Sequence, residues 1–198
     1  MAKRLFDLLA AALGLVLLAV PGLLVAFAIK LDSPGPVFFR QERVGRFGRR
    51  FRIHKFRTMR ADAERTGGPL TVGADARVTR VGALLRTRRL DELPQLIDVL
   101  AGHMSLVGPR PEVPRYVALY PASLRDQVLA VRPGITDPAS LTFRDEAGQL
   151  AAAADPEREY IDVILPRKLA LAADYATRAN LWTDLGLIAR SLGVLLNR

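Results

Sequence analysis

An Asp-Glu pair and the arginines before it are the residues of this sequence best suited to chemistry. Asp91 and Glu92 are adjacent, and Arg86 and two further arginines stand within five residues of them. Pro94 is tolerated in the first turn of a helix, so we expect a helix from about Asp91 to Leu100. Asp91 is then either a simple helix cap or an ionised carboxylate beside guanidiniums. An ionised carboxylate can attack phosphorus or hold a divalent cation.

A second segment presents one arginine in a stiff setting. Arg110 follows Gly108 and lies between two prolines. Stiff flanks reduce the entropy lost when a guanidinium binds a phosphate. The alternative interpretation is a structural turn with a surface arginine. Both segments together favour chemistry on phosphates.

Other catalytic chemistries have little support in the sequence. The chain has no cysteine, which excludes disulfides, thiolate zinc sites and cysteine nucleophiles. His54 and His103 have no evident catalytic partner along the chain, and we expect a structural role for both.

Composition limits the classes of partner. The chain has 198 residues, enough for one domain with a core, and a formal net charge of +9. Half of the residues are hydrophobic. The charge predicts a polyanionic partner, which could be nucleic acid, an anionic lipid surface or a phosphorylated substrate.

The N-terminal segment predicts a membrane element. The range Leu8–Ile29 has no charged residue, and as a helix it would reach roughly 33 Å, enough for a bilayer core of about 30 Å. Pro21, followed by glycine, should break this helix. Lys3 and Lys30 make both flanks basic, and basic flanks stay in the cytoplasm. We therefore expect residues 1–31 to form a re-entrant helix hairpin; a signal peptide and a buried core helix are the alternatives.

The rest, residues 32–198, is expected to form a mostly helical α+β domain. Two short strands, Val37–Phe39 and Phe51–Ile53, should flank a glycine turn. Hydrophobic spacing predicts a basic amphipathic helix over residues 77–89. Near the C-terminus, an apolar helical stripe from residue 181 onward has Trp182 beside it, which suits either a core or a membrane interface.

The order of the motifs resembles that of the bacterial sugar transferase family, the monotopic phosphoglycosyl transferases, in their short form with the catalytic domain alone. The resemblance covers almost the whole chain. It rests on these segments in order: Lys3-Arg4-Leu5-Phe6-Asp7, Ser33-Pro34-Gly35-Pro36-Val37-Phe38, Lys55-Phe56-Arg57-Thr58-Met59, Leu90-Asp91-Glu92-Leu93-Pro94-Gln95, Met104 to Pro111, and Arg132-Pro133-Gly134-Ile135-Thr136.

The resemblance implies a membrane enzyme at the cytoplasmic face of the inner membrane, with amphipathic helices on anionic lipids. Asp91 and Glu92 match the family dyad. Asp91 would attack the sugar-bearing phosphorus of a UDP-sugar, UMP would leave, and polyprenyl (undecaprenyl) phosphate would accept the phosphosugar. Mg²⁺, with Asp91 as a ligand, would assist both steps. Arg57, Arg86 and Arg110 would contact phosphates.

The same resemblance places the reaction at the first membrane step of exopolysaccharide, O-antigen or glycoprotein glycan assembly. Many members continue the Pro-Gly-Ile-Thr motif with Gly-Trp-Ala-Gln, whereas this chain has Asp137-Pro138-Ala139-Ser140. The sequence leaves the sugar open, and the oligomeric state too, a homo-oligomer being one alternative.

Two other functions compete with this one. A basic nucleic-acid-binding protein would use aromatic residues among basic ones, as at Phe47 and Phe51. That interpretation gives no role to the uncharged N-terminal segment or to the Asp-Glu pair, so we expect no nucleic acid as partner. A non-catalytic membrane scaffold would not need the intact pair of carboxylates.

Overall fold

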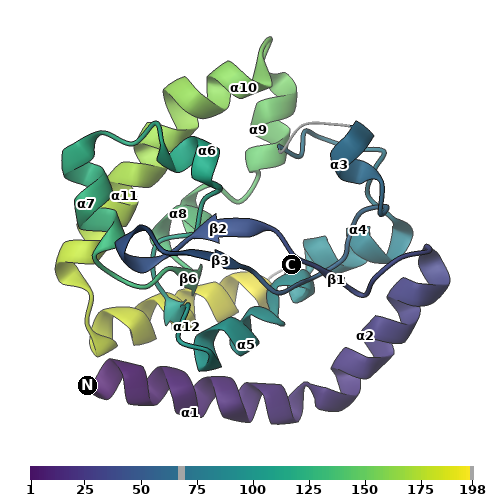
Figure 1. Ribbon diagram of the computed structural model, residues 1–198, viewed down its shortest axis with the longest axis horizontal. Helices are drawn as coiled ribbons and strands as arrows, with labels where there is room; N and C mark the ends of the chain where they lie inside the picture. Colours follow the sequence, from purple (N-terminus) through teal and green to yellow (C-terminus); the bar gives the residue numbers. More distant parts are fainter. Residues whose placement is uncertain (67–69, 197–198) are drawn as a thin grey trace.

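The computed structural model describes residues 1–66 and 70–196. Helices dominate this part of the chain, and its strands form three two-stranded sheets. The mostly helical α+β fold expected from the sequence is therefore confirmed. Figure 1 shows the N-terminal helices along the lower edge of the molecule, with the rest of the chain above them.

The N-terminal segment forms two helices, α1 (Ala2–Leu17) and α2 (Ala19–Asp32), which meet at an angle of 61°. The break lies at Leu18 and not at Pro21, where we expected it. Proline has no N–H for the carbonyl four residues earlier, that of Leu17, and its ring crowds that carbonyl. The bend therefore falls one turn before the proline.

This bent pair is the only candidate for a membrane element in the described residues. No single helix there is long and apolar enough to cross a membrane, whereas α1 and α2 together pass the same length and composition test. Large apolar side chains on the pair are exposed: Leu5, Leu9, Leu13, Val16, Leu17, Val20, Leu23, Leu24, Phe27 and Leu31. The opposite side of α1 packs on the domain, where Ala11 is fully buried against Leu96 and Val99.

Polar contacts fasten the start of α1 to strand β5 (Ser105–Val107). The ammonium of Lys3 donates to Ser105 Oγ at 2.8 Å and to the carbonyl of Val107 at 3.0 Å, and it also pairs with Asp184. Asp7 is buried and accepts from Ser105 Oγ at 2.8 Å. The N-terminal helix is thus bound directly to a strand of the domain.

The strands after α2 form two antiparallel ladders. β1 (Phe38–Phe39) pairs with β4 (Lys55–Phe56), and β2 (Glu42–Val44) pairs with β3 (Arg50–Arg52) around a short 3-10 turn, η1 (Arg46–Gly48). Extended structure around the glycine turn was expected. The pairing was not, because the strand containing Phe38 lies against β4 and not against the strand of Phe51.

β5 pairs in parallel with β6 (Gly134–Thr136). The two backbones approach so closely at Gly108 and Gly134 that a Cβ on Gly134 would lie 2.0 Å from the nitrogen of Gly108. Only glycine fits there. This contact places the turn that carries Arg110 beside the chain that leaves β6.

The remaining helices cover these strands. They are α3 (Ala63–Thr66), α4 (Arg80–Thr87), η2 (Leu90–Glu92), α5 (Gln95–Leu100), α6 (Pro114–Val117), α7 (Ala122–Leu129), α8 (Pro138–Thr142), α9 (Glu146–Ala152), α10 (Pro156–Glu159), the π-helical turn η3 (Tyr160–Ile164), α11 (Leu165–Arg178) and α12 (Leu181–Leu196). The expected basic helix over residues 77–89 is present as α4.

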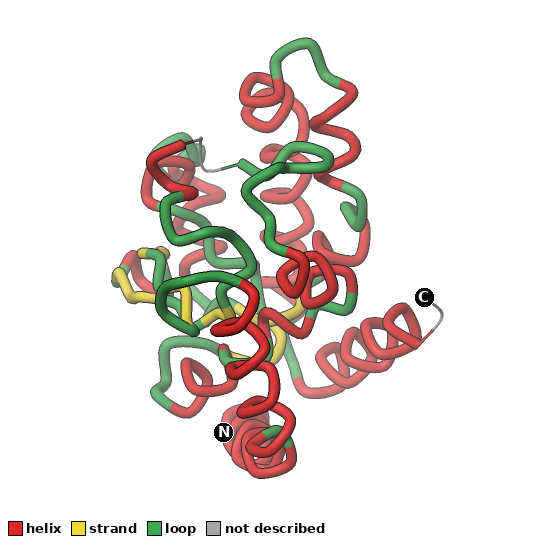
Figure 2. The backbone as a smooth tube through the Cα atoms, turned by 90° about the vertical axis from the view of Figure 1, so that its right-hand side faces the viewer, coloured by secondary structure: helices red, strands yellow, loops and turns green. Residues whose placement is uncertain are grey.

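The C-terminal helix α12 extends away from the body of the molecule in Figure 2. Trp182 is 81 % exposed on it, and Leu192 is also exposed, whereas Leu187 is buried against Val107 and Tyr175. One side of α12 therefore packs on the domain, and another presents apolar side chains outward.

Candidate active site

The Asp-Glu pair lies on a tight 3-10 turn between α4 and α5. Asp91 and Glu92 are both buried in η2, and α5 begins only at Gln95, with Pro94 as its N-cap. The prediction that the helix starts at Asp91 is therefore wrong, and Asp91 does not cap it. The chain turns earlier because Arg89 adopts the left-handed conformation, with φ 52°. The buried carboxylates must find partners in side chains and not in a helix dipole.

Lys55 is the partner that the sequence analysis missed. Its ammonium lies 2.7 Å from Asp91 Oδ2 and 3.4 Å from Glu92 Oε1. Lys55 and Arg57 belong to the same sequence motif, and position within that motif led us to predict a phosphate contact for Arg57 and not for Lys55. The strand β4 ends at Phe56, and the two basic side chains then have different surroundings.

Arg110 also reaches the pair, through Glu92. Its Nη2 lies 2.5 Å from Glu92 Oε1, and its Nη1 donates to Oε2 at 3.4 Å. Burial alone would raise the pKa of Glu92, but the charges of Arg110 and Lys55 outweigh it and hold that pKa well below its usual value. Glu92 is therefore an anion that links two cations across the site.

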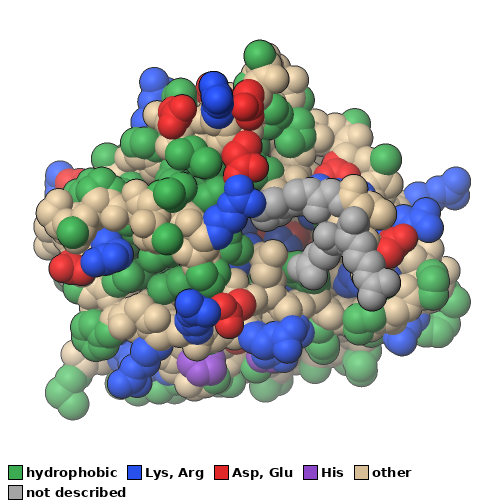
Figure 3. All heavy atoms as spheres, turned by 45° about the horizontal axis from the view of Figure 1, so that its top comes forward, with side chains coloured by type: hydrophobic (Ala, Val, Ile, Leu, Met, Phe, Trp, Pro, Cys, Tyr) green, Lys and Arg blue, Asp and Glu red, His purple; other side chains and the backbone are tan. Residues whose placement is uncertain are grey.

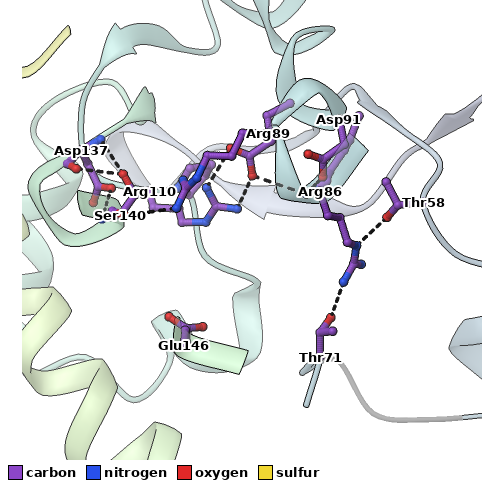
Figure 4. Close-up of polar contacts among 12 residues, drawn as sticks. Thr58, Thr71, Arg86, Arg89, Asp91, Arg110, Asp137, Ser140 and Glu146 are labelled. Carbon is purple, nitrogen blue, oxygen red and sulfur yellow. Dashed lines mark hydrogen bonds and ion pairs between the residues drawn. The ribbon is translucent and has the colours of Figure 1, made fainter. Parts of the chain in front are cut away.

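Arg86 approaches from α4 on the other side of Asp91, as Figure 4 shows. Its Nε donates to Thr58 Oγ1 at 2.8 Å and its Nη1 to Thr71 Oγ1 at 3.1 Å. Burial lowers the pKa of Arg86, and the nearby charge of Asp91 acts against this shift. Two threonine hydroxyls thus orient a guanidinium whose charge acts on Asp91.

Arg57 does not join these residues. It is 4 % exposed, and its guanidinium donates to the carbonyls of Pro36 at 2.6 Å, Pro34 at 2.8 Å and Ser33 at 2.8 Å. It also donates to Ser33 Oγ at 2.9 Å and to the carbonyl of Ile29 at 3.5 Å. Our prediction of a phosphate contact for Arg57 disagrees with this geometry. The side chain instead binds the chain that leaves α2.

A buried acid supports Arg110 from behind. Glu112 accepts from the hydroxyl of Tyr160 at 2.7 Å, and it pairs with Lys168 at 3.6 Å and Arg43 at 3.9 Å. It lies two residues after Arg110, so these contacts fix the far side of that turn. Its one signal in the sequence is an acid directly after the proline that follows Arg110.

The two histidines have structural roles, as expected. His54 is bound to Asp98 twice: its backbone N–H donates to Oδ2 and its Nδ1 lies 2.8 Å from Oδ1. His103 stacks on Phe51, with ring centroids 5.5 Å apart. Neither contacts the Asp-Glu pair.

The carboxylate oxygens of the site suit a hard cation only together with oxygens of a bound substrate. The described residues contain no group of three or more acidic, histidine or cysteine side chains placed to hold a metal. Mg²⁺ is commonly bound by one or two carboxylates plus substrate phosphates. Asp91 and Glu92 fit that pattern, with Asp91 the better donor because Glu92 pairs with both Arg110 and Lys55, whereas Asp91 pairs with Lys55.

Basic side chains are not confined to this site. Lys and Arg are scattered over the face in Figure 3, with acidic side chains between them.

Comparisons with known proteins identify the family of this chain. The profile of the bacterial sugar transferase family matches residues 1–198. The chain is 41 % identical over 199 residues to a UDP-glucose:undecaprenyl-phosphate glucose-1-phosphate transferase of Caulobacter vibrioides, covering 98 % of this chain and 69 % of that protein. It is 46 % identical over 136 residues to a UDP-N-acetylgalactosamine-undecaprenyl-phosphate N-acetylgalactosaminephosphotransferase of Aeromonas hydrophila, covering 68 % of this chain and 32 % of that protein.

A third relative is named for the same sugar as the second. A putative undecaprenyl-phosphate N-acetylgalactosaminyl 1-phosphate transferase of Bacillus subtilis is 48 % identical over 113 residues, covering 57 % of this chain and 63 % of that protein. The chain thus spans 32 to 69 % of the length of these relatives. Their names share the lipid acceptor and differ in the sugar. With a match along its whole length, the chain belongs to the bacterial sugar transferase family.

Proposed function

We propose that this protein transfers a sugar-1-phosphate from a UDP-sugar to polyprenyl phosphate, which gives polyprenyl-diphosphate-sugar and UMP. The observation that carries the proposal is the buried Asp91 carboxylate, paired with Lys55 and flanked by the Glu92–Arg110 pair. The relatives named above act on undecaprenyl phosphate, which supports the acceptor.

The reaction proceeds in two displacements at one phosphorus atom. In the first, an oxygen of Asp91 forms a bond to the sugar-bearing phosphorus, and the bond from that phosphorus to the bridging oxygen breaks. UMP leaves with that oxygen and its electron pair. In the second, an oxygen of polyprenyl phosphate attacks the same phosphorus and releases the Asp91 carboxylate.

The cations stabilise charge on the phosphates during both displacements. Arg110 offers the forked donors that suit a phosphate, and Arg86 is already oriented by its two threonine partners. Lys55 pairs with Asp91 before the attack and is placed to follow the charge onto the phosphoryl oxygens. Glu92 holds Lys55 and Arg110 together.

Mg²⁺ fits the donor set described above, and Asp91 is the residue that would hold it together with the substrate phosphates. The bound ion would supply neutralisation of phosphate charge. The residues of this chain bind and orient the diphosphate around it.

The membrane contact follows from the exposed apolar surfaces. The outer side of the α1–α2 pair enters the cytoplasmic face of the inner membrane as a re-entrant element, with its basic flanks toward anionic lipids. Trp182 on α12 lies at the interface, where tryptophan is favoured. The acceptor lipid then reaches the site from the membrane, at the first membrane step of glycan assembly.

The test is release of UMP without an acceptor. Purified protein in detergent is incubated with a panel of UDP-sugars and no polyprenyl phosphate. UMP should appear in an amount limited by the enzyme, and intact-protein mass spectrometry should show the phosphosugar adduct. Asp91→Asn should abolish both while the protein stays folded. Asp126→Asn, a matched change on the exposed helix α7, should leave both unchanged.

A single displacement predicts the opposite result. Polyprenyl phosphate would then attack the donor directly, so UMP would appear only when the acceptor is present and no adduct would form. That outcome with an otherwise active enzyme would remove Asp91 as the nucleophile. Absence of turnover with every UDP-sugar, acceptor included, would overturn the proposed donor class.

A further inference from the structure

Arg89 links the turn of the Asp-Glu pair to the start of α8. Its backbone lies in the left-handed region, with φ 52° and ψ 22°, which a residue with a side chain seldom adopts. Its Nη2 donates to the carbonyl of Ser140 at 3.1 Å. Figure 4 shows the long side chain crossing from η2 past Arg110 to reach Ser140. The backbone conformation and the bond to Ser140 therefore fix both ends of the Arg89 side chain.

The carbonyl that receives Arg89 is itself held by a capping box. Asp137 Oδ1 accepts from the backbone N–H of Ser140 at 2.8 Å, and Ser140 Oγ donates to the carbonyl of Asp137 at 2.9 Å. Asp137 is 2 % exposed and directly follows β6. Because β6 pairs with β5, the box keeps a fixed position relative to Arg110.

Charges on both sides connect this unit to the site. The charge of Arg89 helps to lower the pKa of Glu92, after the larger effects of Arg110 and Lys55. Glu92 raises the pKa of Arg110 above its usual value, and the charge of Asp137 adds to this shift. Arg89 therefore belongs to the same electrostatic cluster as the residues assigned to phosphate binding.

We propose that Arg89 is a further binding residue for the diphosphate of the nucleotide-sugar, and that the box of Asp137 and Ser140 is its positioning element. A guanidinium is planar and carries five N–H groups, so the bond to Ser140 fixes the orientation of the whole plane. The inference rests on the proposed function, because it needs a phosphorylated donor at the site.

The first part of the test compares two neighbouring arginines. Arg89→Ala should lower kcat/KM for the UDP-sugar by about tenfold or more, mainly through KM, since a charge-assisted contact to the donor is lost. Arg89→Lys should recover part of this, because it keeps the charge without the fork. Arg88→Ala removes the same charge from an exposed side chain one residue earlier and should leave kcat/KM unchanged.

The second part separates the cap of Asp137 from its charge. Asp137→Asn and Asp137→Ala both remove the charge, but only asparagine keeps a side-chain oxygen for the cap. KM is compared between Asp137→Asn and Asp137→Ala, first in protein that has Arg89 and then in protein that carries Arg89→Ala. The change in KM from Asn to Ala is the step of interest. If the box acts through Arg89, the step raises KM in the first case and has no effect in the second.

Three results would overturn the inference. They are wild-type kinetics of Arg89→Ala, an equal loss in Arg88→Ala, and an Asn-to-Ala step that is the same in both backgrounds. Thermal unfolding identifies any variant that fails to fold; Ser140→Ala, which removes half of the box and keeps the carbonyl, then replaces Asp137→Ala in the cycle. A wild-type protein without UMP release would instead overturn the proposed function itself.

Discussion

Replacing Arg57 by alanine should loosen the junction between α2 and the domain, and the structure gives the size of the effect. The buried guanidinium makes four hydrogen bonds of 2.6 to 2.9 Å to the segment 33–36. Bonds to charged groups contribute roughly 1.5 to 3 kcal/mol each, but those sharing one group do not add fully. We expect a loss of about 3 to 5 kcal/mol in the free energy of unfolding.

For a chain of this size that loss should lower Tm by roughly 6 to 20 °C. The measurement is thermal unfolding of the purified protein in detergent, followed by kcat on the folded fraction. Arg110→Ala is the contrast in activity, since it should lower kcat/KM by about tenfold or more, whereas folded Arg57→Ala should keep its kcat. Arg57→Lys should fall between wild type and Arg57→Ala, because an ammonium cannot reach all of the carbonyls at once.

The reasoning fails if Arg57→Ala keeps the wild-type Tm and loses turnover. That pattern would place Arg57 at the substrate, as its position in the sequence motif first indicated. A large drop in Tm with normal kcat at a temperature where the protein is folded would support the structural role.

Three further predictions concern the site and the membrane. Lys55→Met should abolish the UMP burst as Asp91→Asn does, and a burst of wild-type size would exclude Lys55 from the first displacement. Glu92→Gln should destabilise the protein at neutral pH; because the folded pKa of Glu92 is depressed, the difference in stability from wild type should shrink as pH falls below about 4.5, and a constant difference would show that the pairing is not electrostatic. Cysteines introduced in turn at Ala2 and Asp126 should both be protected from an impermeant thiol reagent in intact cells, whereas labelling at Ala2 alone would establish a full span.

Local rules account for what the sequence predicted correctly. A long uncharged segment, a proline within it and a glycine turn between apolar pairs each act over a few residues, so they predicted the bent N-terminal helices and the strands around η1. The order of motifs indicated the family and the pair Asp91 and Glu92. Even here the break fell at Leu18, because a proline disturbs the turn before it and not its own.

The partners of the charged side chains depended on contacts between distant parts of the chain. Lys55 and Arg57 lie two residues apart in one motif, yet one ammonium meets Asp91 and the other side chain meets the segment after α2. The local sequence does not explain this difference. β4 ends between the two residues, and the surroundings of Lys55 come from η2 whereas those of Arg57 come from the end of α2. Long-range packing decided which cation meets the Asp-Glu pair and which one holds the chain at the end of α2.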